Sequence, residues 1–160
     1  MSSLRLRRAT RRPASLTDMH VTDLAINKAM GMQIATDASA HILELPEGPL
    51  LLNHIGTVHA SVQFALAEAC SGEFLLRQLS IGANGVLAVL RTSEVKFRKP
   101  ARGALRASAL FAEGGAEAVS TELRSRGRVL VSVLVEVSDT QGVTMSGLYN
   151  WFLQKPGGAV

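Results

Sequence analysis

The sequence predicts an α+β domain in which one buried helix lies against a large antiparallel sheet. One long helical segment, from Val58 or His59 to about Arg77, has apolar or small residues on nearly every face. This is typical of a helix that other structure encloses. After residue 85 the chain reads as successive short strands separated by turns that contain glycine. These two observations together favour a helix packed on a sheet.

The segments before the long helix are shorter. Residues 17–30 predict an amphipathic helix that is capped by Thr17 or Asp18 and ended by Gly31. Residues 32–35 and 41–45 then predict two short strands, with a proline-rich turn over residues 46–49.

Five strands are predicted after the helix. They cover residues 86–96, 104–112, 118–125, 129–137 and 143–153. The fourth is the clearest, because a valine occupies every second position from Val129 to Val137. The spacing is that of an antiparallel meander.

A chain of 160 residues is expected to form one domain, over residues 17–155, with a tail at 156–160. Residues 1–16 hold five of the 17 basic residues and no acid, so the remainder carries 12 basic against 13 acidic residues. We therefore expect no nucleic-acid-binding surface on the domain. Residues 1–16, an arginine-rich arm, are expected to be disordered. The alternatives are a tether to nucleic acid or a membrane, and a transit peptide.

The single cysteine, Cys70, indicates a reducing and hence cytoplasmic location, and we expect it to be a small buried side chain of the helix. Residues 48–67 contain no charged residue, but six polar side chains interrupt them, so no membrane span is expected. The four histidines and Cys70 show no spacing typical of metal ligands.

The candidate chemistry lies in the long helix. Glu68 is an isolated carboxylate in its apolar middle, where an unpaired charge is costly to bury. A polar loop precedes the helix, whose first N–H groups favour negative charge. A carboxylate and an anion-stabilising helix start are two parts that acyl transfer requires. The alternative is a structural Glu68 paired with an arginine of the sheet.

These residues also resemble a known family. Asn53, Gly56 and His59, followed by Phe64, Leu66, Ala67 and Glu68, resemble the "N, HGG, F-x-L-A-D" pattern of phenylacetyl-CoA-type thioesterases of the hotdog superfamily. Residues 95–103 and 135–142 resemble two further segments of that family. The resemblance implies a hotdog fold, with a long central helix wrapped by a five- or six-stranded antiparallel sheet. It also implies hydrolysis of an acyl-CoA or acyl-carrier thioester. Ala60-Ser61 stands where the family has Gly-Gly, and Glu68 where this branch has Asp.

The resemblance gives each residue an expected role. Glu68 is expected to be the general base or the nucleophile. The backbone N–H groups of Ala60 and Ser61 are expected to form the oxyanion hole. Asn53 either holds the thioester carbonyl or the water, or is a turn residue, and His59 either contacts substrate or caps the helix. Glu73 is the rival carboxylate, which we expect to be solvated.

The spacing indicates a dimer. His59 and Glu68 are nine residues apart, which on a regular helix places them on opposite faces and about 13 Å apart along the axis. One chain therefore cannot bring both to one thioester carbon, and we expect a homodimer or homotetramer with shared sites.

Four basic residues complete the expected site. Lys96, Arg98, Lys99 and Arg102 either contact the phosphates of coenzyme A or form a solvated face. No cofactor is expected beyond coenzyme A as part of the substrate. Two alternative functions remain, a non-catalytic acyl-CoA-binding module and a hotdog dehydratase.

Overall fold

The computed structural model describes residues 19–36, 40–81 and 85–156. The expected arm at 1–16, the predicted caps Thr17 and Asp18, and all of the tail except Pro156 lie outside these residues. The elements in chain order are a 3₁₀ turn (Val21–Asp23), α1 (Ala25–Met30), β1 (Gln33–Ile34), β2 (Leu43–Leu45), a second 3₁₀ turn (Pro49–Leu51), α2 (Ala60–Leu79), β3 (Leu87–Phe97), β4 (Leu105–Phe111), α3 (Ala116–Arg126), β5 (Arg128–Asp139) and β6 (Gly142–Gln154).

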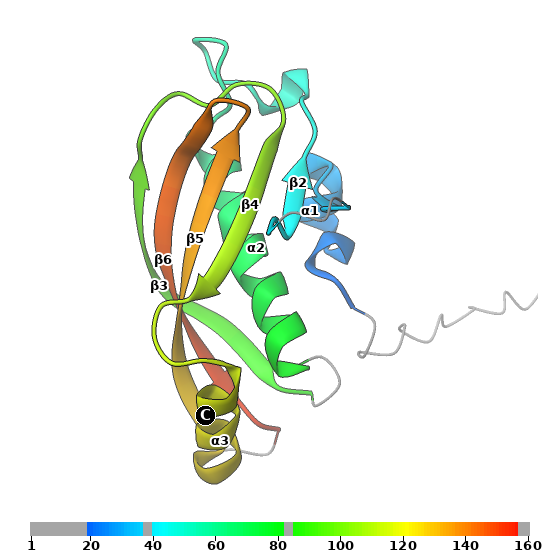
Figure 1. Cartoon of the computed structure of the whole chain (residues 1–160). Helices are drawn as coiled ribbons and strands as arrows, with labels where there is room; N and C mark the ends of the chain where they lie inside the picture. Colours follow the sequence, from blue (N-terminus) through cyan, green and yellow to red (C-terminus); the bar gives the residue numbers. More distant parts are fainter. Residues whose placement is uncertain (1–18, 37–39, 82–84, 157–160) are drawn as a thin grey trace, which may run out of the picture.

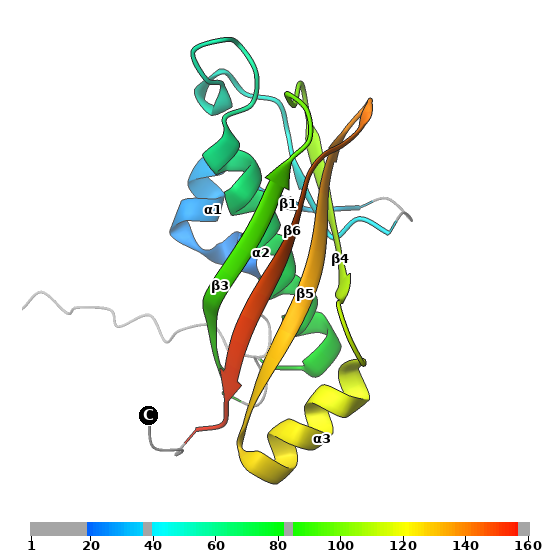
Figure 2. The ribbon, with the colours of Figure 1, turned by 90° about the vertical axis from the view of Figure 1, so that its left-hand side faces the viewer.

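The strands form one antiparallel sheet in the order β1-β2-β4-β5-β6-β3. Its centre is the long β5–β6 hairpin, which pairs from Arg128 with Gln154 to Asp139 with Gly142. β3 returns along the far side of β6 and forms one edge of the sheet (Figure 1). Figure 2 shows β3, β6, β5 and β4 side by side in front of α2.

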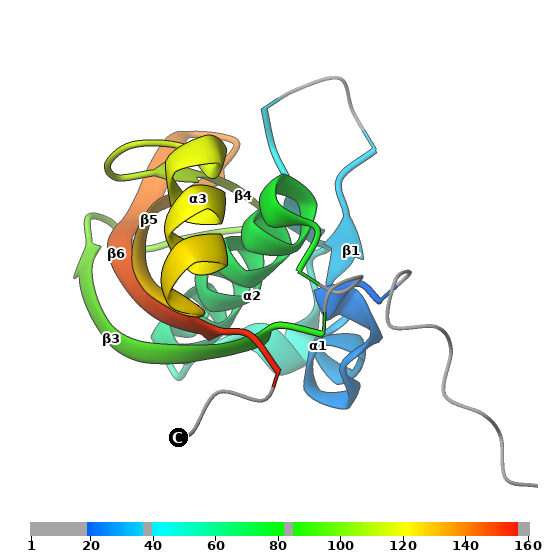
Figure 3. The same cartoon turned by 90° about the horizontal axis from the view of Figure 1, so that it is seen from below.

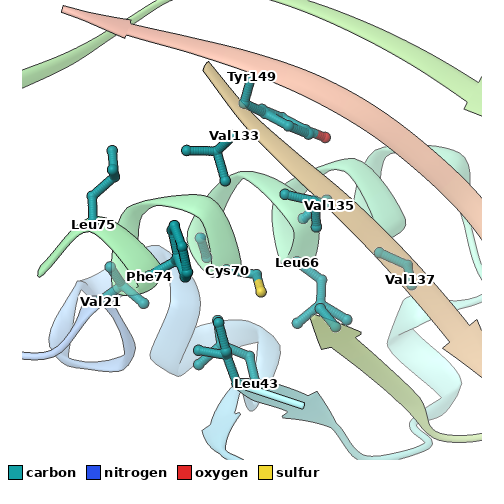
Figure 4. Packing of buried hydrophobic residues seen from close by; sticks show 14 of the residues in the cluster. Val21, Leu43, Leu66, Cys70, Phe74, Leu75, Val133, Val135, Val137 and Tyr149 are labelled. Carbon is teal, nitrogen blue, oxygen red and sulfur yellow. The ribbon is translucent and has the colours of Figure 1, made fainter. Parts of the chain in front are cut away.

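The sheet curves around α2, which it contacts with its inner face (Figure 3). The alternation predicted for residues 129–137 is confirmed, because all five valines at alternate positions from Val129 to Val137 are buried and the residues between them face outward. Figure 4 shows Leu66, Cys70 and Phe74 of α2 within this core. Cys70 is fully buried, as predicted. The α+β prediction is therefore confirmed.

The prediction of a strand over residues 118–125 is wrong, because this segment is the helix α3. Its sequence is rich in Ala, Glu, Leu and Arg, which favour helices. Val119 and Leu123, four residues apart, form its buried side, and Gly127 ends it in a left-handed conformation. The sheet consequently has six strands, within the expected range.

The predicted helix over residues 17–30 is divided in the described part of the chain. A 3₁₀ turn precedes α1, and Leu24 between them is extended, with φ −63° and ψ 137°. Gly31 ends α1 with φ +80°, as predicted. α1 lies on the side of α2 away from β5 and β6 (Figures 1 and 3).

Candidate active site

In the part of the chain that the structure describes, the first turn of α2 has one backbone donor without an acceptor. His59 caps the helix, and its Nδ1 accepts a hydrogen bond from the Ser61 N–H at 3.1 Å. The N–H groups of Val62 and Gln63 donate to the His59 carbonyl at 3.0 and 3.2 Å. Within the described residues, the Ala60 N–H has no acceptor. The positive end of the helix therefore presents the Ala60 N–H to a ligand.

The loop before α2 is closed by Asn53. Its Oδ1 accepts from the N–H groups of Ile55 and Thr57, both at 3.1 Å, and its Nδ2 donates to Thr57 Oγ1 at 2.8 Å. Gly56, with φ +74°, supplies the left-handed residue that this turn needs. The structure thus uses the Asn53 side chain as a turn residue, the second of its two expected roles.

Glu68 lies in the middle of α2, eight residues after Ala60. It belongs to a half-buried stripe along one side of the helix that also includes Phe64, Ala65 and Gly72. Phe64 contacts Tyr149, and Gly72 lies against Trp151, so this side of α2 faces β6. β6 is the neighbour of the edge strand β3.

The surroundings of the Glu68 carboxylate set it apart from the other acidic residue in the middle of α2, Glu73. Among the described residues, no hydrogen bond or ion pair reaches it, so the structure gives no support to the alternative of an arginine-paired Glu68. Burial raises the pKa of Glu68 above the ordinary value for glutamate. A carboxylate that is half-buried, has a raised pKa and lacks a counter-ion is well suited to act as a general base.

Glu73 has the opposite environment, and the expectation that it is solvated is wrong. Its side chain is fully buried and accepts hydrogen bonds from the Val21 N–H at 3.0 Å and Arg77 Nε at 2.9 Å. The Val21 N–H reaches Oε2, whereas Arg77 Nε donates to Oε1, and His20 Nδ1 lies 2.8 Å from the same Oε1. The residues before α1 fold over α2 here and cover the carboxylate. Burial alone would raise the pKa of Glu73, but these partners hold it below its ordinary value.

The basic residues fall into two groups. The loop after β3 runs beside the start of α2, because the Val58 N–H donates to the Ala101 carbonyl at 2.9 Å. In this loop Lys99 Nζ lies 3.4 Å from Asp139 Oδ1, and the exposed Arg102 donates its N–H to Asp139 Oδ2 at 3.3 Å.

Lys96 and Arg98 do not join that group. They line a groove of about 600 Å³ on the outer face of the sheet. The Arg98 guanidinium donates to Ser146 Oγ there, at 2.9 and 3.1 Å. Of the four expected contacts to coenzyme A, the structure brings only Lys99 and Arg102 close to the start of α2.

The edge strand β3 lies beside β6, the strand that the Glu68 stripe faces. All of its eleven residues are exposed or half-buried, and in the described part of the sheet β6 is its one partner. Val95 and Phe97 lie on its inner face, opposite Gly147 and Met145 of β6, and Phe97 is 46% exposed. A long unpaired edge with exposed apolar side chains favours pairing with another chain.

Tyr149 is the residue of this region that the sequence analysis missed. It lies on the inner face of β6 and is fully buried against Phe64, with ring centroids 5.7 Å apart. The position of Tyr149 could have been inferred, because Gly147, Tyr149 and Trp151 occupy every second position of the predicted strand over residues 143–153, which places all three on one face.

Comparisons with known proteins agree with this architecture. A family model described as "Domain of unknown function (DUF4442)" matches residues 29–153. The chain belongs to this family. No curated protein matches the DUF4442 chain at a significant level.

Solved structures resemble the DUF4442 chain over most of its length. One is a protein of unknown function from Pseudomonas aeruginosa, described as a probable thioesterase, with 24% identity, a TM-score of 0.68, and coverage of 84% of this chain and 91% of that one. Another is a thioesterase from Haemophilus influenzae, with 14% identity, a TM-score of 0.65, and coverage of 86% and 88%. A Bacillus halodurans protein crystallised with CoA has 26% identity, a TM-score of 0.55, and coverage of 69% of each chain. These likenesses confirm the hotdog fold.

The described ranges also bear on a membrane span and on a metal site. None of the helices there combines the length and the apolar character needed to cross a membrane. In the same ranges, no three His, Cys, Asp or Glu side chains come together as metal ligands would.

Proposed function

We propose that this chain is a thioesterase that hydrolyses an acyl-CoA or acyl-carrier thioester to the free acid and the thiol, with Glu68 as general base. The observation that carries the proposal is the half-buried Glu68 carboxylate on an enclosed helix that begins at Ala60, since neither this carboxylate nor the Ala60 N–H has a partner among the described residues. The thioesterases among the structural neighbours support the reaction class. The neighbour crystallised with CoA supports CoA as the thiol.

In the proposed reaction Glu68 takes a proton from water as the water oxygen attacks the thioester carbon. The carbonyl oxygen becomes an oxyanion, and the Ala60 N–H, reinforced by the dipole of α2, donates a hydrogen bond to it. The intermediate collapses by breaking the carbon–sulfur bond, and the proton on Glu68 passes to the departing thiolate. Lys99 and Arg102, beside the start of α2, are the proposed contacts to the phosphates of coenzyme A.

The two groups must come from different chains. Ala60 and Glu68 are eight residues apart on a continuous helix, and hence about 12 Å apart along its axis. A thioester carbon cannot contact both from one helix. We propose a two-fold dimer in which Glu68 of one protomer faces the start of α2 of its partner, with the β3 edges and the Glu68 stripes at the seam.

The activity is tested with a panel of acyl- and aryl-CoA thioesters, read by release of free thiol. The wild-type chain is compared with Glu68→Gln and with Glu117→Gln, a matched control because Glu117 is an exposed carboxylate on α3. We expect turnover by the wild type and the control, and a loss of about 10³-fold in Glu68→Gln. Unchanged turnover in Glu68→Gln would contradict the proposed role.

The alternative in which Glu68 is the nucleophile is separated by isotope labelling. A single turnover in H₂¹⁸O places the label in the released acid if Glu68 acts as base. The label enters the Glu68 side chain, detected by peptide mass, if a mixed anhydride forms and water attacks its Glu68 carbonyl.

The oxyanion donor is tested by Ala60→Pro. Ala60 is the first residue of α2, a position that favours proline, and His59 has φ −61° and ψ 140°, which suit a residue before proline. The substitution therefore removes one N–H and leaves the helix. We expect kcat to fall by about 10²-fold with unchanged helical circular dichroism. Unchanged kcat would contradict the role of Ala60.

One observation favours a second candidate, a non-catalytic acyl-CoA-binding module. The Ser61 N–H already donates to His59, so the first turn offers one oxyanion donor at Ala60 where two residues were expected. Calorimetric binding of acyl-CoA with no thiol release across the panel would support this candidate over the thioesterase.

A further inference from the structure

Tyr149 is the only tyrosine of the chain, and it sits deep in the molecule. In the sheet it pairs with Val133 of β5 and Ser93 of β3, and its side chain points towards α2 (Figure 4). The ring lies over Gly147 of the same strand. A Cβ at Gly147 would stand 2.9 Å from Tyr149 Cε2 and 2.8 Å from Val95 Cγ1, so the ring position depends on glycine there.

The Tyr149 hydroxyl is buried and has no hydrogen-bond partner among the described residues. A buried tyrosine normally finds a partner for its hydroxyl, because leaving it unsatisfied costs free energy. Phenylalanine would fill the same space without that cost. We therefore expect the hydroxyl to have a hydrogen-bond partner when the protein is active.

The candidate that we consider is the Glu68 carboxylate, which acts electrostatically on the Tyr149 hydroxyl. Phe64, which contacts the Tyr149 ring, lies one helical turn before Glu68 on the same stripe of α2. Figure 4 shows the hydroxyl directed towards the part of α2 that holds Leu66, away from Phe74. Both groups lack a partner among the described residues, and each supplies what the other needs, a donor and an acceptor.

The charges around the hydroxyl agree with this pairing. Burial raises the pKa of Tyr149 well above its ordinary value, and the Glu68 carboxylate and Cys70 raise it further. Burial also raises the pKa of the Cys70 thiol to about 12, so Cys70 is neutral in the acid range. The strand neighbours Val133 and Ser93 carry no charge. Tyr149 thus remains protonated, and hence a donor, wherever Glu68 titrates.

We propose that Tyr149 is a positioning residue of the active site, whose hydroxyl donates a hydrogen bond to the Glu68 carboxylate and turns its free oxygen towards the attacking water. This inference rests on the proposed function for its catalytic meaning, but the contact itself does not. A donor to the carboxylate stabilises its ionised form and so offsets part of the effect of burial on the basicity of Glu68.

The first test is Tyr149→Phe, which removes one oxygen atom and keeps the ring. We expect kcat to fall about tenfold with KM nearly unchanged, and the acid limb of the pH profile to move to higher pH, because Glu68 loses a donor. A structural hydroxyl would move neither the pH profile nor kcat. The matched control is Ser132→Ala, which removes a hydroxyl from the outer face of the same sheet, where Ser132 Oγ donates to Asn150. Ser132→Ala should leave kcat and the pH profile unchanged.

The second test needs no activity. Tyrosine labelled with ¹³C at Cζ gives one NMR signal, because the chain has one tyrosine. We expect this signal to shift with pH through one acid-range titration in the wild type and to stay constant in Glu68→Gln. A flat wild-type signal would overturn the contact even if the protein hydrolyses thioesters. An acid limb of the pH profile that does not move in Tyr149→Phe would also overturn the contact. The titration without any hydrolysis would keep the contact and reject the proposed function.

Discussion

Glu68 and Glu73 stand five residues apart on α2 and have opposite surroundings. Glu73 is fully buried and has three partners, from His20, Val21 and Arg77. Glu68 is half-buried and has no partner among the described residues. The pKa of Glu73 is lowered and that of Glu68 is raised. A carboxylate that is satisfied within the fold stabilises it, whereas one left unsatisfied is available to a substrate.

The largest expected difference between them is in turnover. Gln keeps the shape of Glu and removes its basicity, so Glu68→Gln should lower kcat by about 10³-fold. Glu73→Gln should retain kcat within about threefold, because Glu73 faces the segment before α1 and takes no part in proton transfer. Thiol release at saturating substrate measures both. Equal losses in the two variants would remove the distinction.

Stability should show the reverse order. Glu73→Ala leaves the buried Val21 N–H without an acceptor, while His20 and Arg77 are partly exposed and can turn to water. We expect a loss of about 2 kcal/mol in the free energy of unfolding. Glu68→Ala breaks no interaction among the described residues and should change it by less than about 0.5 kcal/mol. Urea unfolding measures both values, and a larger loss in Glu68→Ala would contradict the comparison.

The smallest effect is the pH dependence of that stability. Because folding lowers the pKa of Glu73, its contribution is complete above the ordinary value of 4.5 and is lost as the pH falls through the folded value. Because folding raises the pKa of Glu68, its ionisation costs stability above the folded value, and that cost disappears below 4.5. Relative to wild type, Glu73→Gln should be less stable at neutral pH and Glu68→Gln slightly more stable. Both should approach wild type in acid. Urea midpoints between pH 3 and pH 7 measure both differences. A change in midpoint of the same sign in both variants at neutral pH would contradict this account.

The contrast also shows what the sequence could predict. Glu68 was identified because its signal is local, a lone carboxylate in an apolar helix after a polar loop. Glu73 was misjudged because the residues that bury it, His20 and Val21, lie about 50 positions earlier in the chain. Such contacts leave no mark on the periodicity of α2 itself.

The fold was more predictable than the site, for a similar reason. The alternating valines of β5 and the apolar faces of α2 are regular patterns that specify which side is buried. The segment 118–125 was interpreted as a strand because it follows two predicted strands, although Val119 and Leu123 have helical spacing. The sequence could place Tyr149 on the inner face of its strand, but the lack of a partner for its hydroxyl among the described residues could not be predicted, since it depends on which helix face lies opposite β6.

The central claim is that Glu68 and the start of α2 act on one substrate from two different chains. It is tested by co-expressing Glu68→Gln and Ala60→Pro chains with different tags and purifying the mixed dimer through both. Sites shared between chains predict about half of wild-type turnover per mixed dimer, because one of its two sites then has an intact Glu68 and an intact Ala60 N–H. Turnover no higher than that of the two parent variants would place both groups in the same chain's site and contradict the account.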